Sequence, residues 1–164
     1  MIYFFSGSNY ARVTLANNNT MDPGYPLPIA GHWNGLSFPT VEAAVNLGNG
    51  KAYFFLGDSY VSYDIAGDAV DAGFPRQIAP DWPGLFPRGI DGAVNWGNGK
   101  AYFFSGTQYV RWDIATNRAD DGYPLPTSSQ WPSQLTSPID AAVERSSPPT
   151  TTPMRARVRT GLLE

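Results

Sequence analysis

Residues Lys51–Ile65 have the sequence KAYFFLGDSYVSYDI, and this stretch recurs twice elsewhere in the chain. Lys100–Ile114 has the sequence KAYFFSGTQYVRWDI, and Ile2–Leu15 gives the match IYFFSGSNYARVTL. Downstream of each copy, a Gly-aromatic-Pro step begins at residues 24, 73 and 122, which are 49 residues apart. The same interval separates Trp33, Trp82 and Trp131, and also Glu42, Asp91 and Asp140. The chain is therefore built from copies of one unit of about 49 residues.

Each complete copy predicts four short antiparallel strands. The first is a small-residue segment, Val41–Val45 or Ile90–Val94, and the Gly-Asn-Gly-Lys that follows favours a tight hairpin. The second strand carries Ala-Tyr-Phe-Phe, which does not alternate and so predicts burial on both faces. A two-residue Gly-X turn leads into the third strand. The Gly-aromatic-Pro step places the fourth strand at a sheet edge, before a loop or short helical turn that holds the Trp.

A blade with two buried faces must stack between similar blades. Radial stacking of four-stranded blades produces a β-propeller, in which only short edges stay open. Aromatic residues make up 14% of the chain and charged residues 15%, with 17 Gly and 15 Pro, as is typical of an all-β protein of short strands. A β-sandwich is the alternative architecture, but sandwiches do not repeat at this interval. We therefore expect an all-β propeller of three repeats and a partial fourth.

The consensus of the copies resembles the hemopexin repeat. It runs [IV]-[DE]-x-A-V, then G-K-A-Y-F-F-x-G-x-x-Y-V-x-[YW]-D, then G-[YF]-P and W-P, and it extends over roughly residues 1–143. The chain is most like the plant seed albumins and bacterial proteins that carry this fold. The resemblance implies a hemopexin-like β-propeller of four-stranded antiparallel blades. In that family four blades surround a narrow axial channel that often holds calcium, sodium or chloride.

The repeat predicts one domain over residues 1–144, with blades at about 1–40, 41–89 and 90–138 and a partial fourth at 139–144. The first copy lacks its inner strand, whereas the fourth copy consists of an inner strand alone, Ile139–Val143. These two leftover pieces are complementary. We expect Ile139–Val143 to pair with Ile2–Phe5, either within one chain or between two chains of a homodimer. A closed ring of three blades would lie below the usual range, which favours a truncated four-blade ring or assembly between chains.

The charge distribution separates the repeat domain from the tail. Residues 1–144 contain 7 basic and 13 acidic side chains, and residues 145–164 contain 4 Arg and 1 Glu. An acidic body argues against nucleic acid as the main partner. The tail is rich in Pro and Thr, which predicts disorder.

Several features bear on the compartment. No apolar run is long enough to span a membrane, and the opening residues MIYFFSGSNYAR do not resemble a signal peptide. The chain contains no Cys, so it forms no disulfide. The compartment stays open, with a secreted or extracellular location slightly favoured.

The family resemblance implies an axial cation site formed by backbone carbonyls. The donors would be the acidic residue that opens each inner strand and the residue two positions later, namely Glu42, Ala44, Asp91, Ala93, Asp140 and Ala142. Carbonyl oxygens are hard donors of the kind that Ca²⁺ prefers. Calcium is therefore the expected cofactor, with sodium or chloride as alternatives. A different role is also open to these carboxylates, which could cap strand ends or accept hydrogen bonds from neighbouring backbone N–H groups.

The sequence contains no recognisable catalytic constellation. It has no Cys nucleophile, its only histidine is His32, and no Gly-rich phosphate loop opens a helix. One histidine also excludes bis-histidine haem binding within a single chain, and we expect His32 to be a surface loop residue. The recurring Tyr, Phe and Trp positions predict core packing between blades.

Positions that differ between copies are better candidates for recognition, because loops on a rigid scaffold usually carry specificity. These positions are Asn17-Asn18-Asn19, Arg76-Gln77, Arg111 and Arg118. The sequence therefore predicts a non-catalytic binding or scaffold module for a small ligand or a protein partner. An accessory targeting domain of a larger secreted enzyme or toxin is the main alternative, and a lone hydrolase is a third possibility.

Overall fold

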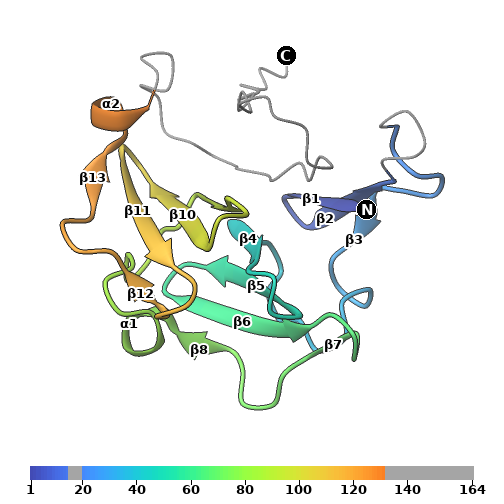
Figure 1. The fold of residues 1–164 in the computed structure, drawn as a ribbon. Helices are drawn as coiled ribbons and strands as arrows, with labels where there is room; N and C mark the ends of the chain where they lie inside the picture. Colours follow the sequence, from blue (N-terminus) through green and yellow to red (C-terminus); the bar gives the residue numbers. More distant parts are fainter. Residues whose placement is uncertain (15–19, 132–164) are drawn as a thin grey trace.

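The computed structural model describes residues 1–14 and 20–131, which form three antiparallel sheets in chain order (Figure 1). The first blade contains β1 (Ile2–Ser6), β2 (Asn9–Val13) and β3 (Leu27–Pro28). The second blade contains β4 (Ala43–Asn46), β5 (Lys51–Leu56), β6 (Ser59–Asp64), β7 (Ala69–Val70), β8 (Arg76–Gln77) and helix α1 (Ile78–Asp81). The third blade contains β9 (Gly92–Asn95), β10 (Lys100–Ser105), β11 (Gln108–Asp113), β12 (Arg118–Ala119), β13 (Leu125–Pro126) and helix α2 (Thr127–Gln130). Ile139–Val143 and the tail at 145–164 lie outside the described residues.

The second and third blades have the strand order that the sequence predicts. In the second blade the order is β4-β5-β6-β7, and β8 pairs with the other end of β6, so that the fourth strand is present as two short pieces. The third blade repeats this arrangement with β9-β10-β11-β12 and β13. The inner strands begin two residues later than expected, at Ala43 and Gly92. Both complete copies thus fold into the predicted blade.

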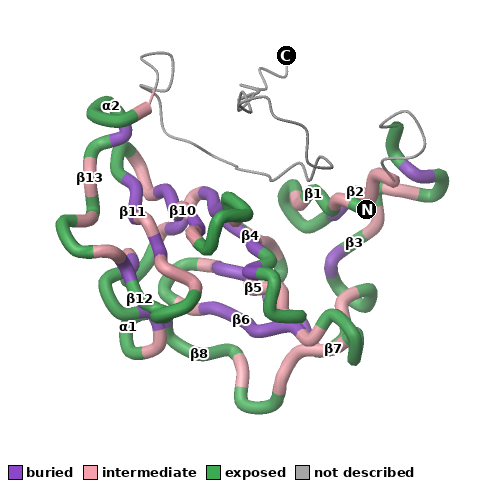
Figure 2. The backbone as a smooth tube through the Cα atoms, in the orientation of Figure 1, coloured by how far each residue is buried: buried purple, intermediate pink, exposed green. Residues whose placement is uncertain are grey.

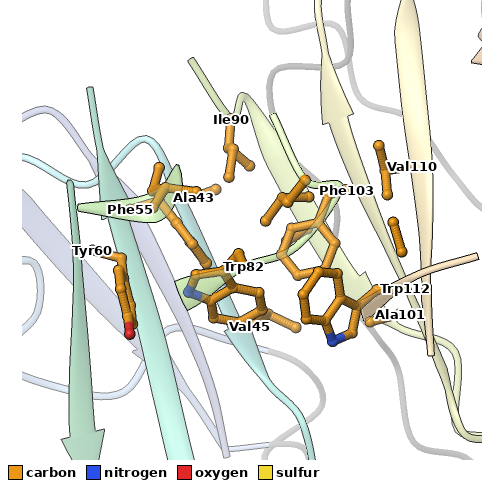
Figure 3. Packing of buried hydrophobic residues seen from close by; sticks show 14 of the residues in the cluster. Ala43, Val45, Phe55, Tyr60, Trp82, Ile90, Ala101, Phe103, Val110 and Trp112 are labelled. Carbon is orange, nitrogen blue, oxygen red and sulfur yellow. The ribbon is translucent and has the colours of Figure 1, made fainter. Parts of the chain in front are cut away.

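The blades stack through aromatic rings at repeated positions. Trp82 follows α1 in the second blade and is only 4% exposed. Its ring centroid lies 5.3 Å from that of Phe55 in its own blade and 4.9 Å from that of Trp112 in the third blade (Figure 3). Trp33 of the first blade similarly lies 5.2 Å from Phe54 of the second. One packing arrangement therefore joins the first blade to the second and the second to the third.

The Phe-Phe strand is buried in two copies and exposed in one. Phe54 on β5 and Phe103 on β10 are 1% and 0% exposed, as the missing alternation predicts, but Phe4 on β1 is 45% exposed. The expectation of burial on both faces is therefore wrong for β1. Phe54 is covered by Phe5 and Trp33 of the first blade, and Phe103 is covered by Trp82 of the second blade. Among the described residues no blade precedes the first, so the equivalent face of β1 stays open. Figure 2 shows the buried backbone concentrated in the second and third blades.

A second contact joins the blades near their outer edges. The loop after each Trp approaches the outer strand of the next blade: Val70 N–H donates to the Asn34 carbonyl at 2.9 Å, and Ala119 N–H donates to the Pro83 carbonyl at 3.0 Å. Gly84 lies in this loop at φ +83°, and a Cβ placed there would be 2.8 Å from the Ala119 Cβ. The close approach therefore requires glycine.

Substitution of Gly84 by alanine tests this close approach. Gly50 is a matched control, because its φ is +81° and nothing lies within 4 Å of an added Cβ. We expect Gly50→Ala to cost about 1–2 kcal/mol of unfolding free energy from backbone strain alone. Gly84→Ala should cost about 1–3 kcal/mol more from overpacking. Equal losses for the two variants in urea unfolding would contradict the tight contact.

The stacked tryptophans give a second prediction. Trp82→Ala should lower the free energy of unfolding by about 3–5 kcal/mol, the usual cost of truncating a buried aromatic side chain. Trp131 occupies the same repeat position but is only half-buried, so Trp131→Ala should cost at least about 1 kcal/mol less. Chemical denaturation measures both values. Unchanged unfolding of Trp82→Ala would show that this ring does not support the stack.

Candidate functional site

The inner strands β4 and β9 lie next to each other in neighbouring blades, and their ends are linked by a side-chain bond. The Nδ2 group of Asn95 donates to the backbone carbonyl of Asn46 at 3.0 Å. The Oδ1 atoms of the same two residues accept from Gly97 N–H at 3.0 Å and Gly48 N–H at 2.8 Å, which closes the hairpin turns. The predicted ligand pairs Glu42/Ala44 and Asp91/Ala93 are thus carried on or immediately before adjacent strands.

The acidic residues that precede these strands are engaged within their own blades. The Glu42 carboxylate accepts from Gly57 N–H at 2.8 Å, and the Asp91 carboxylate accepts from Gly106 N–H at 2.6 Å. The backbone N–H groups of Glu42 and Asp91 also donate, to the carbonyls of Phe55 and Phe104 at 3.0 Å and 2.9 Å. Each carboxylate therefore fastens an inner strand to the hairpin turn of the same blade, which is the role that the sequence left open as an alternative.

Metal-ligating side chains do not gather at one place in the described part of the chain. Within residues 1–14 and 20–131 there is no group of three or more His, Cys, Asp and Glu side chains that could hold a metal ion. The two carboxylates nearest the expected site already accept backbone hydrogen bonds. The carbonyl site that the family resemblance implies stays a prediction for these strands. The third predicted pair, Asp140 and Ala142, lies outside the described residues.

A repeated ion network was missed at the level of sequence. Lys100 Nζ lies 2.7 Å from Asp113 and 2.8 Å from Asp120. Lys51 forms the same pair of contacts with Asp64 and Asp71, both at 2.7 Å. The recurrence of this Lys-Asp-Asp set in two copies was the available signal. The hydrogen bond from Lys100 is the main reason that the pKa of Asp113 and the pKa of Asp120 lie below the usual range.

The variable positions have different surroundings. Arg111 forms an ion pair with Asp120 and its guanidinium lies 5.2 Å from the ring centre of Tyr123, so this arginine is used within its own blade. Arg76 and Gln77 are exposed on β8, and Arg118 is exposed beside Asp121. His32 is exposed, as expected. Asn17-Asn18-Asn19 lies outside the described residues.

Two open hollows occur on the described surface. One, of about 520 Å³, lies between the loop at Pro83-Gly84 and the outer strand of the third blade. The other, of about 220 Å³, is lined by Tyr102, Tyr109, Arg111, Tyr123, Gln130 and Trp131. Tyr102, Tyr109 and Trp131 correspond in the repeat to Tyr53, Tyr60 and Trp82, which form the side of the second blade that stacks on the third. The smaller hollow is therefore the equivalent side of the third blade.

The ion network predicts a dependence of stability on pH. The pKa of Asp120 is lowered first by Lys100 and then, after the opposing effect of desolvation, by Arg111. A carboxylate with a lowered folded-state pKa stabilises the fold above its unfolded pKa, about 3.9, and this contribution is lost as the pH falls through the folded value. Asp120→Asn should therefore lower the Tm at pH 7, and the difference from wild type should shrink below about pH 4.

The neighbouring residue Asp121 serves as control, because its side chain is 95% exposed and pairs with the exposed Arg118. Asp121→Asn should leave the Tm nearly unchanged across the same pH range, as is usual for exposed ion pairs. A constant difference between Asp120→Asn and wild type from pH 7 to pH 2.5 would contradict the electrostatic explanation. Thermal unfolding followed by circular dichroism measures all three proteins.

Stacked antiparallel blades with small-residue inner strands define a repeat protein of the propeller class. A sequence model of the hemopexin family matches residues 2–37, 41–86 and 90–133, one segment for each copy. The chain therefore belongs to the hemopexin family. No curated protein matches the sequence.

Solved structures agree with this assignment. The hemopexin-fold protein CP4 from cow pea is 23% identical with a TM-score of 0.70, and the match covers 86% of this chain and 71% of that chain. The seed albumin LS24 from Lathyrus sativus is 25% identical with a TM-score of 0.74, covering 87% and 71%. A plant lectin with two metal binding sites from Cicer arietinum is 25% identical with a TM-score of 0.66, covering 80% and 64%. The predicted hemopexin-like propeller fold is thus confirmed. In the described part of the chain, no helix is long and apolar enough to cross a membrane.

Proposed function

We propose that this protein is a non-catalytic binding module of the hemopexin fold that holds a cation, with calcium as the first candidate, among its inner strands. The observation that carries the proposal is the pairing of the Glu42 and Asp91 carboxylates with Gly57 and Gly106 N–H groups. This pairing holds the two carboxylates at the turns of their own blades, and the proposal therefore assigns the ligand role to backbone carbonyls of the adjacent strands β4 and β9. Such oxygens suit a hard cation.

The similarity to the Cicer arietinum lectin supports a metal-binding role, since that protein is described as having two metal binding sites. In this chain the cation would act as a structural element. It would link inner strands of different blades, which are otherwise joined at one end by the bond from Asn95 to Asn46. Recognition of a small ligand or a protein partner would fall to exposed groups at the outer edges, such as Arg76 and Gln77 on β8.

The surroundings of the titratable side chains support a non-catalytic role. The pKa of Tyr60 is raised to about 12, chiefly by burial and then by the hydrogen bond to Asp81, so this phenol stays protonated at neutral pH. The described Asp side chains with lowered pKa values pair with Lys or Arg: Asp22 pairs with Arg12, and Asp64, Asp71, Asp113 and Asp120 belong to the Lys-Asp-Asp sets. A general base instead needs a pKa near the working pH.

Calcium titration of the full chain tests the proposal. Wild type should bind calcium with a heat of binding and a rise in Tm. In Asp91→Asn the amide oxygen can still accept from Gly106 N–H and the backbone carbonyl is unchanged. Its affinity should therefore fall less than about tenfold, which is about 1.4 kcal/mol. Glu42→Gln is the matched variant in the second blade and should behave in the same way.

Two results would contradict the proposal in different ways. Loss of calcium binding in Asp91→Asn, at an unchanged Tm in the absence of calcium, would indicate a carboxylate ligand instead of a carbonyl. Absence of binding by wild type at millimolar calcium would remove the cation and leave the carboxylates with their role in fastening strands to turns.

A further inference from the structure

Within residues 1–14 and 20–131, the inner edge of β1 is open, whereas the inner edges of β5 and β10 are covered by β4 and β9. The β5 strand pairs with β4 on one side and β6 on the other, and β10 pairs with β9 and β11. Among the described strands, β1 pairs only with β2. Tyr3 and Phe4 on β1 are 38% and 45% exposed. An apolar strand edge with unpaired backbone groups is a site for the addition of another strand.

Residues of the neighbouring inner strand are also incompletely covered. Ala44 on β4 is half-buried, whereas Ala93 at the same position of β9 is 2% exposed. Val41 is half-buried, whereas its counterpart Ile90 is 0% exposed. Ala44 and Val41 both belong to the hydrophobic cluster that joins the first and second blades. Phe5 of β1 belongs to the same cluster, which therefore joins β1 to the partly covered residues at and before β4.

We propose that Ile139–Val143 of the same chain adds to the open edge of β1 as the inner strand of the first blade. The two complete blades define the register. Ala43 lies opposite Phe55 and Val45 opposite Tyr53, and in the third blade Gly92 lies opposite Phe104. By the same register, Ala141 pairs with Phe5, Ala142 with Phe4 and Val143 with Tyr3. The added strand has small residues at the positions where β4 and β9 also have Ala or Gly.

The turn after β1 offers the anchor that such a strand needs. Gly57 and Gly106 have φ values of +62° and +54° and donate their N–H groups to Glu42 and Asp91. Gly7 occupies the same turn position with φ +55°. Asp140 stands at the repeat position of Glu42 and Asp91, so its carboxylate is the acceptor for Gly7 N–H.

The length of the connection favours the same chain over a second copy. Seven residues separate Trp131 from Ile139, and seven also separate Trp82 from Ile90 and Trp33 from Val41. Ile139–Val143 thus follows its preceding Trp after the same short linker as the two described inner strands, and seven residues span up to about 25 Å when extended. A short tether gives an effective concentration on the order of millimolar, far above that of a second molecule in dilute solution.

Disulfide trapping tests both the register and the source of the strand, since the chain contains no Cys of its own. Residues directly opposite in an antiparallel pair have Cβ atoms close enough to form a disulfide. Tyr3→Cys/Val143→Cys should form an intramolecular disulfide on mild oxidation. Val45→Cys/Tyr53→Cys is the positive control, because this pair is opposite in the second blade. Tyr3→Cys/Ala142→Cys shifts the register by one residue, which places the two sulfurs on opposite faces.

The disulfides are read on a non-reducing gel and by intact mass at micromolar protein. We expect the Tyr3/Val143 pair to be oxidised within the monomer to the extent of the positive control, and at least about tenfold faster than the shifted pair. A disulfide-linked dimer would overturn the same-chain proposal in favour of a second copy. The pairing itself would be overturned if the Tyr3/Val143 variant formed no disulfide under conditions that oxidise the control. It would also be overturned if the register-shifted Tyr3/Ala142 variant formed its disulfide at the same rate.

Hydrogen exchange of the full chain gives a second readout that needs no cysteine. Ala142→Pro removes a backbone donor from the added strand, and Ala156→Pro in the tail is its control. We expect amide exchange across Ile2–Phe5 to rise at least about tenfold in Ala142→Pro and to stay unchanged in Ala156→Pro. Amide exchange across β10, which serves as the internal reference, should be the same in wild type and in both variants. Equal exchange of Ile2–Phe5 in all three would overturn the proposal.

Discussion

The contact on which the rest of this structure depends is the stacking of one blade on the next through a repeated tryptophan. Trp82 is carried by the second blade, yet its ring packs on Phe103 and Trp112 of the third. A single blade has two apolar faces and cannot bury either of them by itself. Each blade therefore depends on its neighbours, and the fold is stabilised mainly by interfaces between repeats.

Stacking brings the backbones of neighbouring blades into contact at both the outer and the inner margin. At the outer margin, the close approach of Gly84 to Ala119 allows the bond between the Ala119 N–H and the Pro83 carbonyl. At the inner margin, Asn95 reaches across to the Asn46 carbonyl. The carbonyls of Pro83 and Asn46 at these margins thus accept hydrogen bonds from the neighbouring blade. Fully exposed ion pairs such as Arg118–Asp121 add little to the free energy of unfolding.

Much of the blade follows from the residues of one copy. The Asn-Gly hairpins, the Gly-X turns and the position of the Trp after the outer strand were predictable because turn chemistry acts over a few residues. The role of Glu42 and Asp91 was not predictable in the same way. A carboxylate at the start of an inner strand can face an axial ion or the turn of its own blade. The choice depends on where Gly57 and Gly106 lie after the hairpin has folded.

By itself, the sequence determined the repeat, the strand order within a blade and the all-β class, because these depend on the recurrence of residues along the chain and on local turns. Only the tertiary structure decided which copies of the motif become core. Phe4 and Phe54 occupy the same position in nearly identical segments, yet they are 45% and 1% exposed. The residues that cover Phe54 belong to another strand and another blade, as Phe5 and Trp33 show. Burial in a repeat protein is a property of neighbours, which no single copy encodes.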